Sequence, residues 1–388
     1  MFSKELIQKF EKLQTPFYYY DMDLLTKTLE EVKQQYQKHN FHVHYALKAN
    51  SNPKILKLIQ SYGLGADCVS GNEVKRAVEC NFTNDKIVFA GVGKSDAEIN
   101  YALDQNILCF NVESMQELEV MNELAAKKNK IASIALRINP NVDAYTHKYI
   151  TTGLEENKFG INPYEFDDVI ALLKKLPNLK LIGLHFHIGS QITDLTPFKK
   201  LCQRVNEINQ WFLQKGYDLK IINVGGGLGI NYKEPDKENI VSYETFFNVF
   251  KEFLEVRADQ EVHFELGRAI VAQCGALISR VLYIKKAINT NFAILDAGMT
   301  ELIRPALYQA YHKIENLTAS LKSEVKSQKY DVVGPICESS DCFGKAMELP
   351  ETERGNLLAI RSTGAYGEVM ASGYNLRDST RQVYSDEL

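Results

Sequence analysis

Long hydrophobic runs, paired cysteines and blocks of basic charge are all missing from this sequence, and each absence excludes a class of protein. No run of about 18 apolar residues occurs, so we expect no membrane-spanning helix. The seven cysteines are scattered and include no C-x-x-C pair, so we expect neither a disulfide framework nor a structural zinc site. The net charge is −4 without any basic cluster, which excludes the usual footprint of nucleic-acid or anionic-membrane binding.

What remains is an ordinary soluble composition. The chain has 388 residues, of which 45% are hydrophobic and 24% charged, enough for one large domain and a smaller one. Its first residues, "MFSKELIQKFEKLQ", are amphipathic and charged and lack the apolar centre of a signal peptide. We therefore expect a cytoplasmic protein with reduced cysteines that acts on small molecules.

Eight short apolar segments alternate with stretches of helical periodicity through the first two thirds of the chain. Intervening stretches such as "NPKILKLIQSYG" place apolar residues three and four positions apart. Eight strand and helix units predict a (β/α)8 TIM-like barrel. A doubly wound sheet usually has fewer strands, and no G-x-G-x-x-G turn follows the first segment. The predicted strands lie at residues 43–48, 65–70, 86–91, 107–114, 131–139, 181–189, 220–227 and 261–267.

The pattern of apolar and polar residues changes after Arg268. Apolar or alternating segments separated by turns follow, with one plausible helix near residues 305–312, so we predict a second, mostly β domain. The early strand at residues 15–21 precedes the barrel and is expected to pair into this second domain. The predicted barrel spans residues 27–268, and the β domain combines residues 1–26 with 269–388.

Polar residues recur at or near the carboxyl ends of the predicted barrel strands, which form the active face of such barrels. A single lysine at a strand end is more often a solvated cap, but this many polar residues at one face favour a binding site. They are Lys48, Asp67, Glu113, Arg137, His187, Gly225 to Gly227 and Glu265.

Three of these features suit one cofactor. The glycine turn follows the seventh strand, where barrels commonly bind phosphate, and it lets backbone N–H groups approach an anion. Pyridoxal 5′-phosphate needs such a site, a lysine for its Schiff base and often an acidic partner for its pyridine nitrogen, roles that Lys48 and Glu265 can fill. The alternative for Glu265 is a surface ion pair with Arg268, which would add little stability.

His185 and His187 lie two positions apart on one strand and therefore project to the same side. An H-x-H pair can hold a metal, but no carboxylate or cysteine is near it in sequence, so we expect no metal. We expect His185 to be a hydrogen-bonded core histidine and His187 to lay its ring against a planar cofactor. The polar segment 139–162, after the fifth strand, is a predicted lid or ligand loop.

Several longer motifs carry a resemblance that covers nearly the whole chain in order. They include "YALKAN", "GADCVSGNE", "HFHIGSQ", "NVGGGLGI", "LDAGMTELIRPALYQAYH", "VVGPICESSD" and "GAYGEVMASGYN". Together they resemble the diaminopimelate decarboxylase family, pyridoxal-phosphate enzymes of the alanine-racemase-like, fold-type III group. The resemblance implies decarboxylation of meso-2,6-diaminopimelate to L-lysine, the last step of lysine biosynthesis.

The resemblance also implies roles for the matching residues. Lys48 resembles the Schiff-base lysine, His187 the residue that stacks on the cofactor ring, and Glu265 the partner of the pyridine nitrogen. Further implied cofactor contacts are Asp67, Ser190, Gly225, Gly226, Gly227, Gly267, Arg268 and Tyr366.

On the substrate side, the resemblance implies binding of a distal carboxylate by Arg268, Arg304 and Tyr308, since guanidinium groups grip carboxylates at two points. Cys337 resembles the group that helps to protonate the carbanion, and Glu338 the contact for the distal ammonium. Tyr366 is a further implied substrate contact. In this family Cys337 and Glu338 come from the second subunit, so the resemblance implies a homodimer with shared active sites.

Two departures and several alternatives accompany this interpretation. The family's E-P-G-R appears here as Glu265 to Arg268 with leucine in place of proline, and "SGYNLRD" departs from the family's ending, which leaves the packing of the last strand open. Within the fold, the alternative is a decarboxylase of another basic amino acid or of carboxynorspermidine. A non-catalytic pyridoxal-phosphate carrier would leave the second domain unexplained, and a metal-dependent hydrolase would leave Lys48 idle. An alanine racemase has no use for a distal-carboxylate site.

Overall fold

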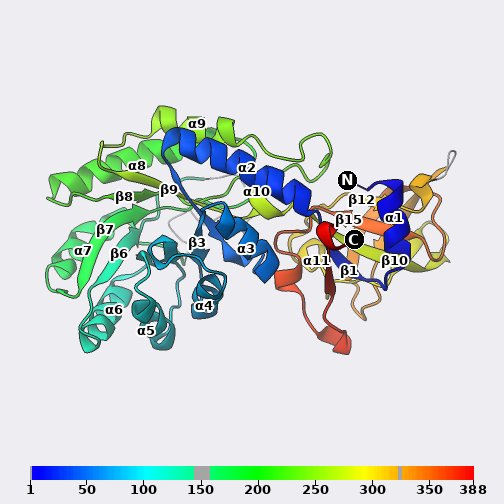
Figure 1. Ribbon diagram of the computed structural model, residues 1–388, viewed down its shortest axis with the longest axis horizontal. Coiled ribbons are helices and arrows are strands. Elements are labelled where there is room, and N and C mark those ends of the chain that lie inside the picture. Colours follow the sequence, from blue (N-terminus) through cyan, green and yellow to red (C-terminus); the bar gives the residue numbers. More distant parts are fainter. Residues whose placement is uncertain (1, 144–157, 322–325) are drawn as a thin grey trace. The chain divides into compact units, whose positions relative to one another are not determined.

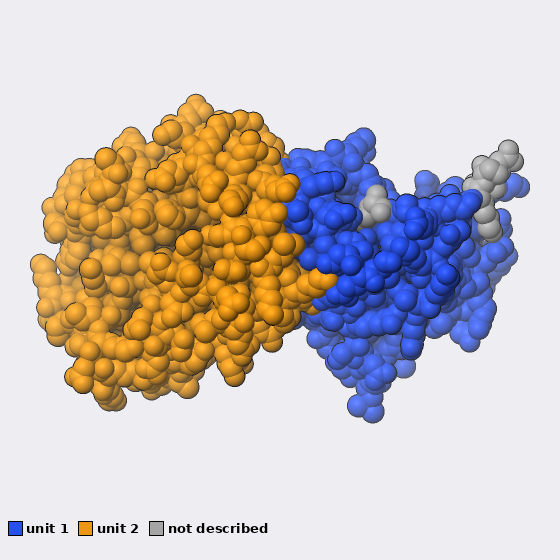
Figure 2. Space-filling model, viewed as in Figure 1, with its two compact units in different colours: residues 1–28, 230–241, 268–388 blue, residues 29–229, 242–267 orange. Residues whose placement is uncertain are grey.

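The computed structural model describes residues 2–143, 158–321 and 326–388, and it divides into two compact units (Figures 1 and 2). Unit 2 comprises residues 29–229 and 242–267. Unit 1 comprises residues 1–28, 230–241 and 268–388. Segment 230–241, which lies inside the range predicted for the barrel, therefore clusters with unit 1.

Unit 2 is a closed barrel of eight parallel strands in chain order, in which the last strand pairs with the first. This confirms the predicted (β/α)8 fold. The strands are β2 (His42–Ala46), β3 (Gly65–Cys68), β4 (Ile87–Phe89), β5 (Cys109–Val112), β6 (Ala132–Arg137), β7 (Leu179–His185), β8 (Ile221–Asn223) and β9 (Glu261–Leu266).

Helices cover the outside of these strands, and polar caps fix where several of them begin (Figure 1). The hydroxyl oxygens of Ser70, Ser95 and Ser114 each accept a hydrogen bond from the backbone N–H three residues later, which turns the chain from strand into helix. The helices are α2 (Met22–His39), α3 (Pro53–Ser61), α4 (Gly71–Glu79), α5 (Asp96–Gln105), α6 (Met115–Lys127), α7 (Phe166–Leu173), α8 (Thr196–Gln214) and α9 (Tyr243–Phe253).

Unit 1 is built on an eight-stranded sheet, which confirms the predicted mostly β domain. Six strands run in the order β12-β15-β10-β11-β13-β14, and β1 pairs with β10 and β16. The elements of this unit are α1 (Lys4–Glu11), β1 (Phe17–Tyr20), α10 (Arg268–Val271), β10 (Gly275–Lys286), β11 (Asn291–Leu295), α11 (Arg304–Tyr308), β12 (Ile314–Asn316), β13 (Ser327–Val333), β14 (Cys342–Pro350), β15 (Leu357–Arg361) and β16 (Arg381–Tyr384).

The early strand β1 pairs with β10 of this unit, as its sequence suggested, and contributes to the unit's aromatic core. Phe17 and Tyr19 pack with Phe10 of α1 and with apolar residues of β10 and β15. The unusual carboxyl-terminal sequence forms β16, which pairs in parallel with β1 and stacks Tyr384 on Tyr20. The tail therefore packs as a sheet strand despite its departure from the family's ending.

The predicted helix at residues 305–312 is shorter than expected. It spans Arg304–Tyr308 and ends because Gln309 adopts a left-handed conformation with φ of 53°. Short 3₁₀ turns complete the structure: η1 (Leu47–Ala49), η2 (Asn84–Lys86), η3 (Pro163–Glu165), η4 (Ala319–Leu321), η5 (Glu368–Met370), η6 (Tyr374–Leu376) and η7 (Ser385–Glu387). No helix among the described residues has both the length and the apolar character that crossing a membrane requires.

Candidate active site

Lys48 lies in a tight turn at the carboxyl end of β2. The sequence had suggested that Lys48 is the last residue of the strand. The strand instead ends at Ala46 and passes into η1, so Lys48 lies just beyond it. Its side chain is 38% exposed, and its Nζ atom lies 3.3 Å from Oδ2 of the fully buried Asp67 at the end of β3. The amine is thus accessible to a ligand while a carboxylate holds it in place.

Gly267 explains how this turn fits against the end of β9. A side chain at this position would press on the Cβ atoms of Ala49 and Ala46, at 2.9 and 3.1 Å. The glycine therefore lets the end of β9 approach the turn that carries Lys48, which is a packing role next to the predicted cofactor site.

Three side chains hold the buried carboxylate of Glu265. Its Oε1 atom accepts hydrogen bonds from Asn223 at 2.8 Å and Asn111 at 3.2 Å, and His185 Nε2 lies 2.9 Å from Oε2. Burial raises the pKa of Glu265, but His185 and the Lys48 ammonium outweigh it, so the net pKa is well below the ordinary value. Glu265 is therefore a buried, permanently ionised group.

His185 has the hydrogen-bonded core position that the sequence predicted. Because the carboxylate only accepts, Nε2 of His185 carries the proton, and its buried Nδ1 has no hydrogen-bond partner among the described residues. The two asparagines that hold Glu265 were not identified from the sequence, because each lies within an apolar strand and nothing local marks its partner.

Asp67 is the second buried carboxyl group of the barrel mouth. Burial, and then the nearby Glu265 carboxylate, raise the pKa of Asp67 above its ordinary value, against the opposing effect of Lys48. Its Oδ1 atom is buried and has no hydrogen-bond partner among the residues described. Two carboxyl groups with pKa values pushed apart are a common feature of functional sites.

His187 and the glycine turn lie together at the ends of β7 and β8. The backbone N–H of Gly226 donates to Nδ1 of His187 at 3.3 Å. Desolvation, and then the Lys48 ammonium, lower the pKa of His187 well below its ordinary value, so its ring is neutral. A neutral, planar ring is suited to stacking on a cofactor.

The glycine turn has a backbone that only glycine fits. Gly225 and Gly227 have φ of 70° and 111°, and a Cβ atom at Gly226 would overlap the carbonyl oxygen of Glu265. The amine, the glycine backbone and the buried carboxylate together fit the chemical needs of pyridoxal phosphate. Ser190 lies half-buried in the loop after β7.

A buried ion pair supports the rim of the barrel mouth. Arg137 Nη1 lies 2.9 Å from Glu113 Oε1, and both side chains are almost fully buried. Glu113 also accepts hydrogen bonds from the backbone N–H groups of Gly91 and Gly160. The pair therefore joins β5 and β6 to neighbouring loops. Most of the predicted ligand loop, at residues 144–157, lies outside the described part of the chain.

Unit 1 brings together two buried arginines on one phenol. Arg268 and Arg304 donate hydrogen bonds to the hydroxyl oxygen of Tyr232 at 2.7 and 2.9 Å. Burial raises the pKa of Tyr232, but the two guanidinium groups lower it by more, so the net pKa is below the ordinary value. Tyr232 was missed from the sequence because its segment, 230–241, reads as a barrel loop yet clusters with unit 1.

His312 fixes the orientation of Arg304. Its Nε2 atom accepts from Arg304 Nη1 at 3.0 Å, and its Nδ1 donates to the carbonyl oxygen of Arg361 at 2.8 Å. Burial, and then the neighbouring Arg304, lower the pKa of His312 to about 3. A neutral histidine in one tautomer therefore holds the guanidinium group.

The remaining predicted site residues of unit 1 form two groups, one near Arg268 and one in the turn between β13 and β14. The Arg268 guanidinium lies over the Tyr366 ring, 4.8 Å from its centroid, and Tyr308 is half-buried at the end of α11. Cys337 and Glu338 are exposed in the turn between β13 and β14. There the Tyr374 hydroxyl donates to Glu338 at 3.0 Å, and the Cys337 backbone N–H donates to Asn375.

Comparisons with known proteins agree along the whole chain. A family model described as "Pyridoxal-dependent decarboxylase, pyridoxal binding domain" matches residues 22–272. The diaminopimelate decarboxylase of Bacteroides thetaiotaomicron is 57% identical over 383 residues, 98% of each chain. That of Helicobacter pylori is 45% identical over 97% of this chain and 91% of its own. The crystal structure of the H. pylori enzyme complexed with L-lysine superposes with a TM-score of 0.89, covering 97% of this chain and 93% of that one at 42% identity.

Proposed function

The chain belongs to the diaminopimelate decarboxylase family of pyridoxal-dependent decarboxylases, and from this premise we propose that it converts meso-2,6-diaminopimelate to L-lysine and carbon dioxide. This reaction is the last step of lysine biosynthesis, and the chain is a carboxy-lyase that depends on pyridoxal phosphate. The structural observation that carries the proposal is the buried, ionised Glu265 in the same barrel mouth as Lys48.

The residues that would hold pyridoxal phosphate are Lys48 through its amine, His187 through its ring, Glu265 through its carboxylate, and Gly225 to Gly227 and Ser190 on the phosphate side. When bound, the cofactor supplies an electron sink for the electron pair left behind as CO₂ departs. Glu265 would hold a proton on the pyridine nitrogen, and its own ionised form is kept by three hydrogen-bond donors. Asp67, at 3.3 Å, positions the Lys48 amine and accepts its hydrogen bond.

The substrate's distal end is assigned to the arginines of unit 1. Two buried guanidinium groups that share one phenol oxygen concentrate positive charge, and a carboxylate neutralises such a pair. Arg268 and Arg304 therefore bind the distal carboxylate in our proposal, with Tyr308 and Tyr366 as further contacts. His312 and Tyr232 are positioning residues, because they act through the arginines.

We further propose a homodimer in which Cys337 and Glu338 act at the site of the second subunit. Both residues are exposed in the single chain, which is what a residue awaiting a partner requires. Cys337 would deliver a proton to the substrate carbon that loses CO₂, and Glu338 would bind the distal ammonium. All seven cysteines are free, which supports a reducing, cytoplasmic location.

Product analysis against a substrate panel tests the proposed function. Purified protein with added pyridoxal phosphate is incubated separately with meso-diaminopimelate, ornithine, arginine and carboxynorspermidine. We expect lysine and CO₂ from diaminopimelate and no comparable turnover of the other three. Faster turnover of ornithine would keep Lys48 and the fold but refute the assignment of Arg304 and Glu338.

A further inference from the structure

A cluster of two histidines and a glutamate lies at the amino-terminal ends of the barrel strands, the face opposite the active mouth. Glu261 and His263 lie two positions apart on β9, so both project to the same side. His42 begins the neighbouring strand β2 and stands directly across from His263 in the strand register. The decarboxylation chemistry uses none of these three residues.

The potential ligand atoms of the cluster are close together. Glu261 Oε2 lies 3.1 Å from His263 Nε2 and 3.8 Å from His42 Nε2, and all three atoms lie within 4.8 Å of one another. The two imidazole rings stack, with centroids 4.7 Å apart. The side chain of His263 is 3% exposed, whereas those of His42 and Glu261 are 43% and 52% exposed. The cluster is therefore anchored on one side and open to solvent on the other.

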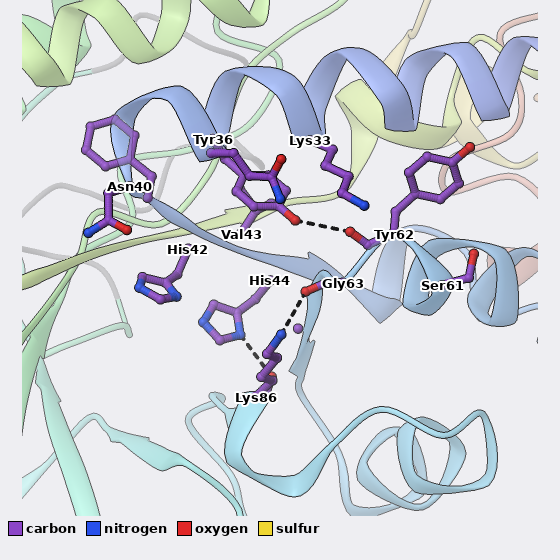
Figure 3. A pocket seen from close by; sticks show the side chains of 13 residues that line it. Lys33, Tyr36, Asn40, His42, Val43, His44, Ser61, Tyr62, Gly63 and Lys86 are labelled. Atoms are coloured by element: carbon purple, nitrogen blue, oxygen red, sulfur yellow. Dashed lines mark hydrogen bonds between the residues drawn. The ribbon is translucent and has the colours of Figure 1, made fainter.

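Hydrogen bonds from His263 through His44 to a backbone carbonyl fix which nitrogen of His263 faces the cluster. His44 Nδ1 lies 3.0 Å from the Lys86 carbonyl oxygen, which only accepts, so Nδ1 of His44 carries a proton (Figure 3). His44 is buried, and burial disfavours its charged form, so its Nε2 is an acceptor. That atom lies 2.8 Å from His263 Nδ1, which must then be the donor.

It follows that Nε2 is the nitrogen of His263 that faces Glu261. Nε2 of His263 lies 3.1 Å from Oε2 of Glu261, and an imidazole nitrogen in this position can offer its lone pair to a cation. The three ligand atoms of His263, Glu261 and His42 are close enough together for one metal ion to accept a lone pair from each of them.

We propose that His42, Glu261 and His263 form a binding site for a divalent transition-metal ion of the Zn²⁺ class. Tetrahedral zinc with bonds of about 2.0–2.2 Å places its ligand atoms about 3.3–3.5 Å apart. The observed separations of 3.1 and 3.8 Å lie on either side of this value, and the exposed His42 side chain closes the difference by rotation. Two nitrogens and one oxygen leave a fourth position for water.

His44 completes the site as a positioning residue. Histidines that bind metal usually donate their second N–H to a nearby acceptor, which fixes the ring and the tautomer. The chain from His263 through His44 to the Lys86 carbonyl has this form. It ensures that Nε2 of His263, and not Nδ1, faces the metal.

A cavity beside the cluster gives a metal ion access to it. The cavity has a volume of about 450 Å³, and His42 and His44 line it together with Tyr36, Tyr62 and Lys86 (Figure 3). The positive charge of the Lys86 ammonium repels a cation that enters this cavity. Its Nζ donates to the Gly63 carbonyl oxygen at 3.1 Å.

The ligands come from the two strands that close the barrel. Because β2 and β9 are its first and last strands, an ion bound by both joins the ends of the sheet. An ion that binds the folded chain in this way raises its unfolding temperature.

Metal titration of the holoenzyme tests the proposal. Protein freed of metal by a chelator is titrated calorimetrically with Zn²⁺, its bound zinc is counted by mass spectrometry, and its unfolding temperature is recorded with and without zinc. The absorption of Co²⁺ bound in its place reports the coordination geometry. We expect one zinc ion per chain, a raised unfolding temperature and tetrahedral Co²⁺ bands.

The variants Glu261→Gln and His42→Ala each remove one ligand at an exposed position, so neither disturbs the core. Each should weaken zinc affinity at least about 10- to 100-fold, the loss seen when even a supporting partner of a metal ligand is removed. His39→Ala removes a histidine outside the cluster and should bind zinc like the wild type. Unchanged affinity in both ligand variants would overturn the proposal, because zinc held at Cys337 or in the barrel mouth would survive them. Absence of binding by the wild type would overturn it equally.

Discussion

Replacing Glu265 with glutamine removes one buried charge while preserving the shape of the side chain. The amide oxygen can still accept from Asn223 and Asn111, as the carboxylate does at 2.8 and 3.2 Å. The new NH₂ group, however, faces Nε2 of His185, which donates to the carboxylate in the wild type, so two donors face each other in the variant. His185 must then move its proton to Nδ1, a buried atom without a hydrogen-bond partner in the described part of the chain.

The expected effects follow from this exchange of partners. A hydrogen bond to a charged group contributes about 1.5–3 kcal/mol, and a buried unpaired polar atom costs about 1–3 kcal/mol. The buried charge that disappears offsets part of this loss, so we expect stability to fall by about 1–3 kcal/mol. The effect on turnover is larger, since the proton on the pyridine nitrogen loses its counter-charge. Loss of one such electrostatic group lowers kcat on the order of 100- to 1,000-fold, or about 2.7–4 kcal/mol.

The assay measures lysine formation at saturating diaminopimelate, cofactor content by absorbance, and stability by denaturant unfolding. Glu119→Gln, at an exposed position on α6, is the matched control and should behave like the wild type. Turnover of Glu265→Gln near the wild-type rate, with cofactor bound, would refute the role assigned to this carboxylate. Loss of cofactor binding alone would assign Glu265 to affinity and not to catalysis.

Four further perturbations test other parts of the structure. Lys48→Ala should abolish turnover and covalent retention of the cofactor, and turnover near the wild-type rate would refute its role. Arg304→Met should raise KM for diaminopimelate strongly, whereas Arg354→Met, an exposed arginine of the same unit, should not. The pKa of His312 is about 3 when folded and about 6.5 when unfolded, so the unfolded chain binds more protons between these values and stability falls as pH drops. One such group costs about 2 kcal/mol between pH 7 and pH 5, and His312→Gln should flatten the unfolding profile by that amount. Asp236, whose pKa Arg361 lowers to about 2, stabilises the fold above about pH 5, so Asp236→Asn should lower the unfolding temperature at pH 7 and lose this effect toward pH 2.

The strands and the residues at their ends could be predicted because both depend on short stretches of sequence. Apolar runs predicted all eight barrel strands, and parallel strands in a closed barrel bring all carboxyl ends to one face. Lys48, Asp67 and the glycine turn could therefore be grouped without knowing any contact. The errors were local as well: the first strand ends two residues before Lys48, and the last predicted helix ends at Tyr308.

The partners of these residues could not be predicted in the same way. Asn111 reaches Glu265 across 154 positions of sequence, and Tyr232 reaches Arg304 across 72. Neither residue carries a local signal, because asparagine in a strand and tyrosine in a loop are common. The sequence predicts no metal at His185 and His187, and it does not indicate the second cluster, because His42 lies beside His263 only when β9 pairs with β2.

By itself, the sequence determined that a barrel is followed by a mostly β domain, the strand order of the barrel, and the chemistry of the cofactor. These depend on hydrophobic periodicity and on residue types at strand ends, which are properties of contiguous segments. Only the tertiary structure decided which groups hold Glu265, that Arg268 and Arg304 share Tyr232, and that His42 meets His263 at the barrel seam. The physical reason is that barrel closure and strand register set these long-range contacts, and no segment of the chain encodes them alone.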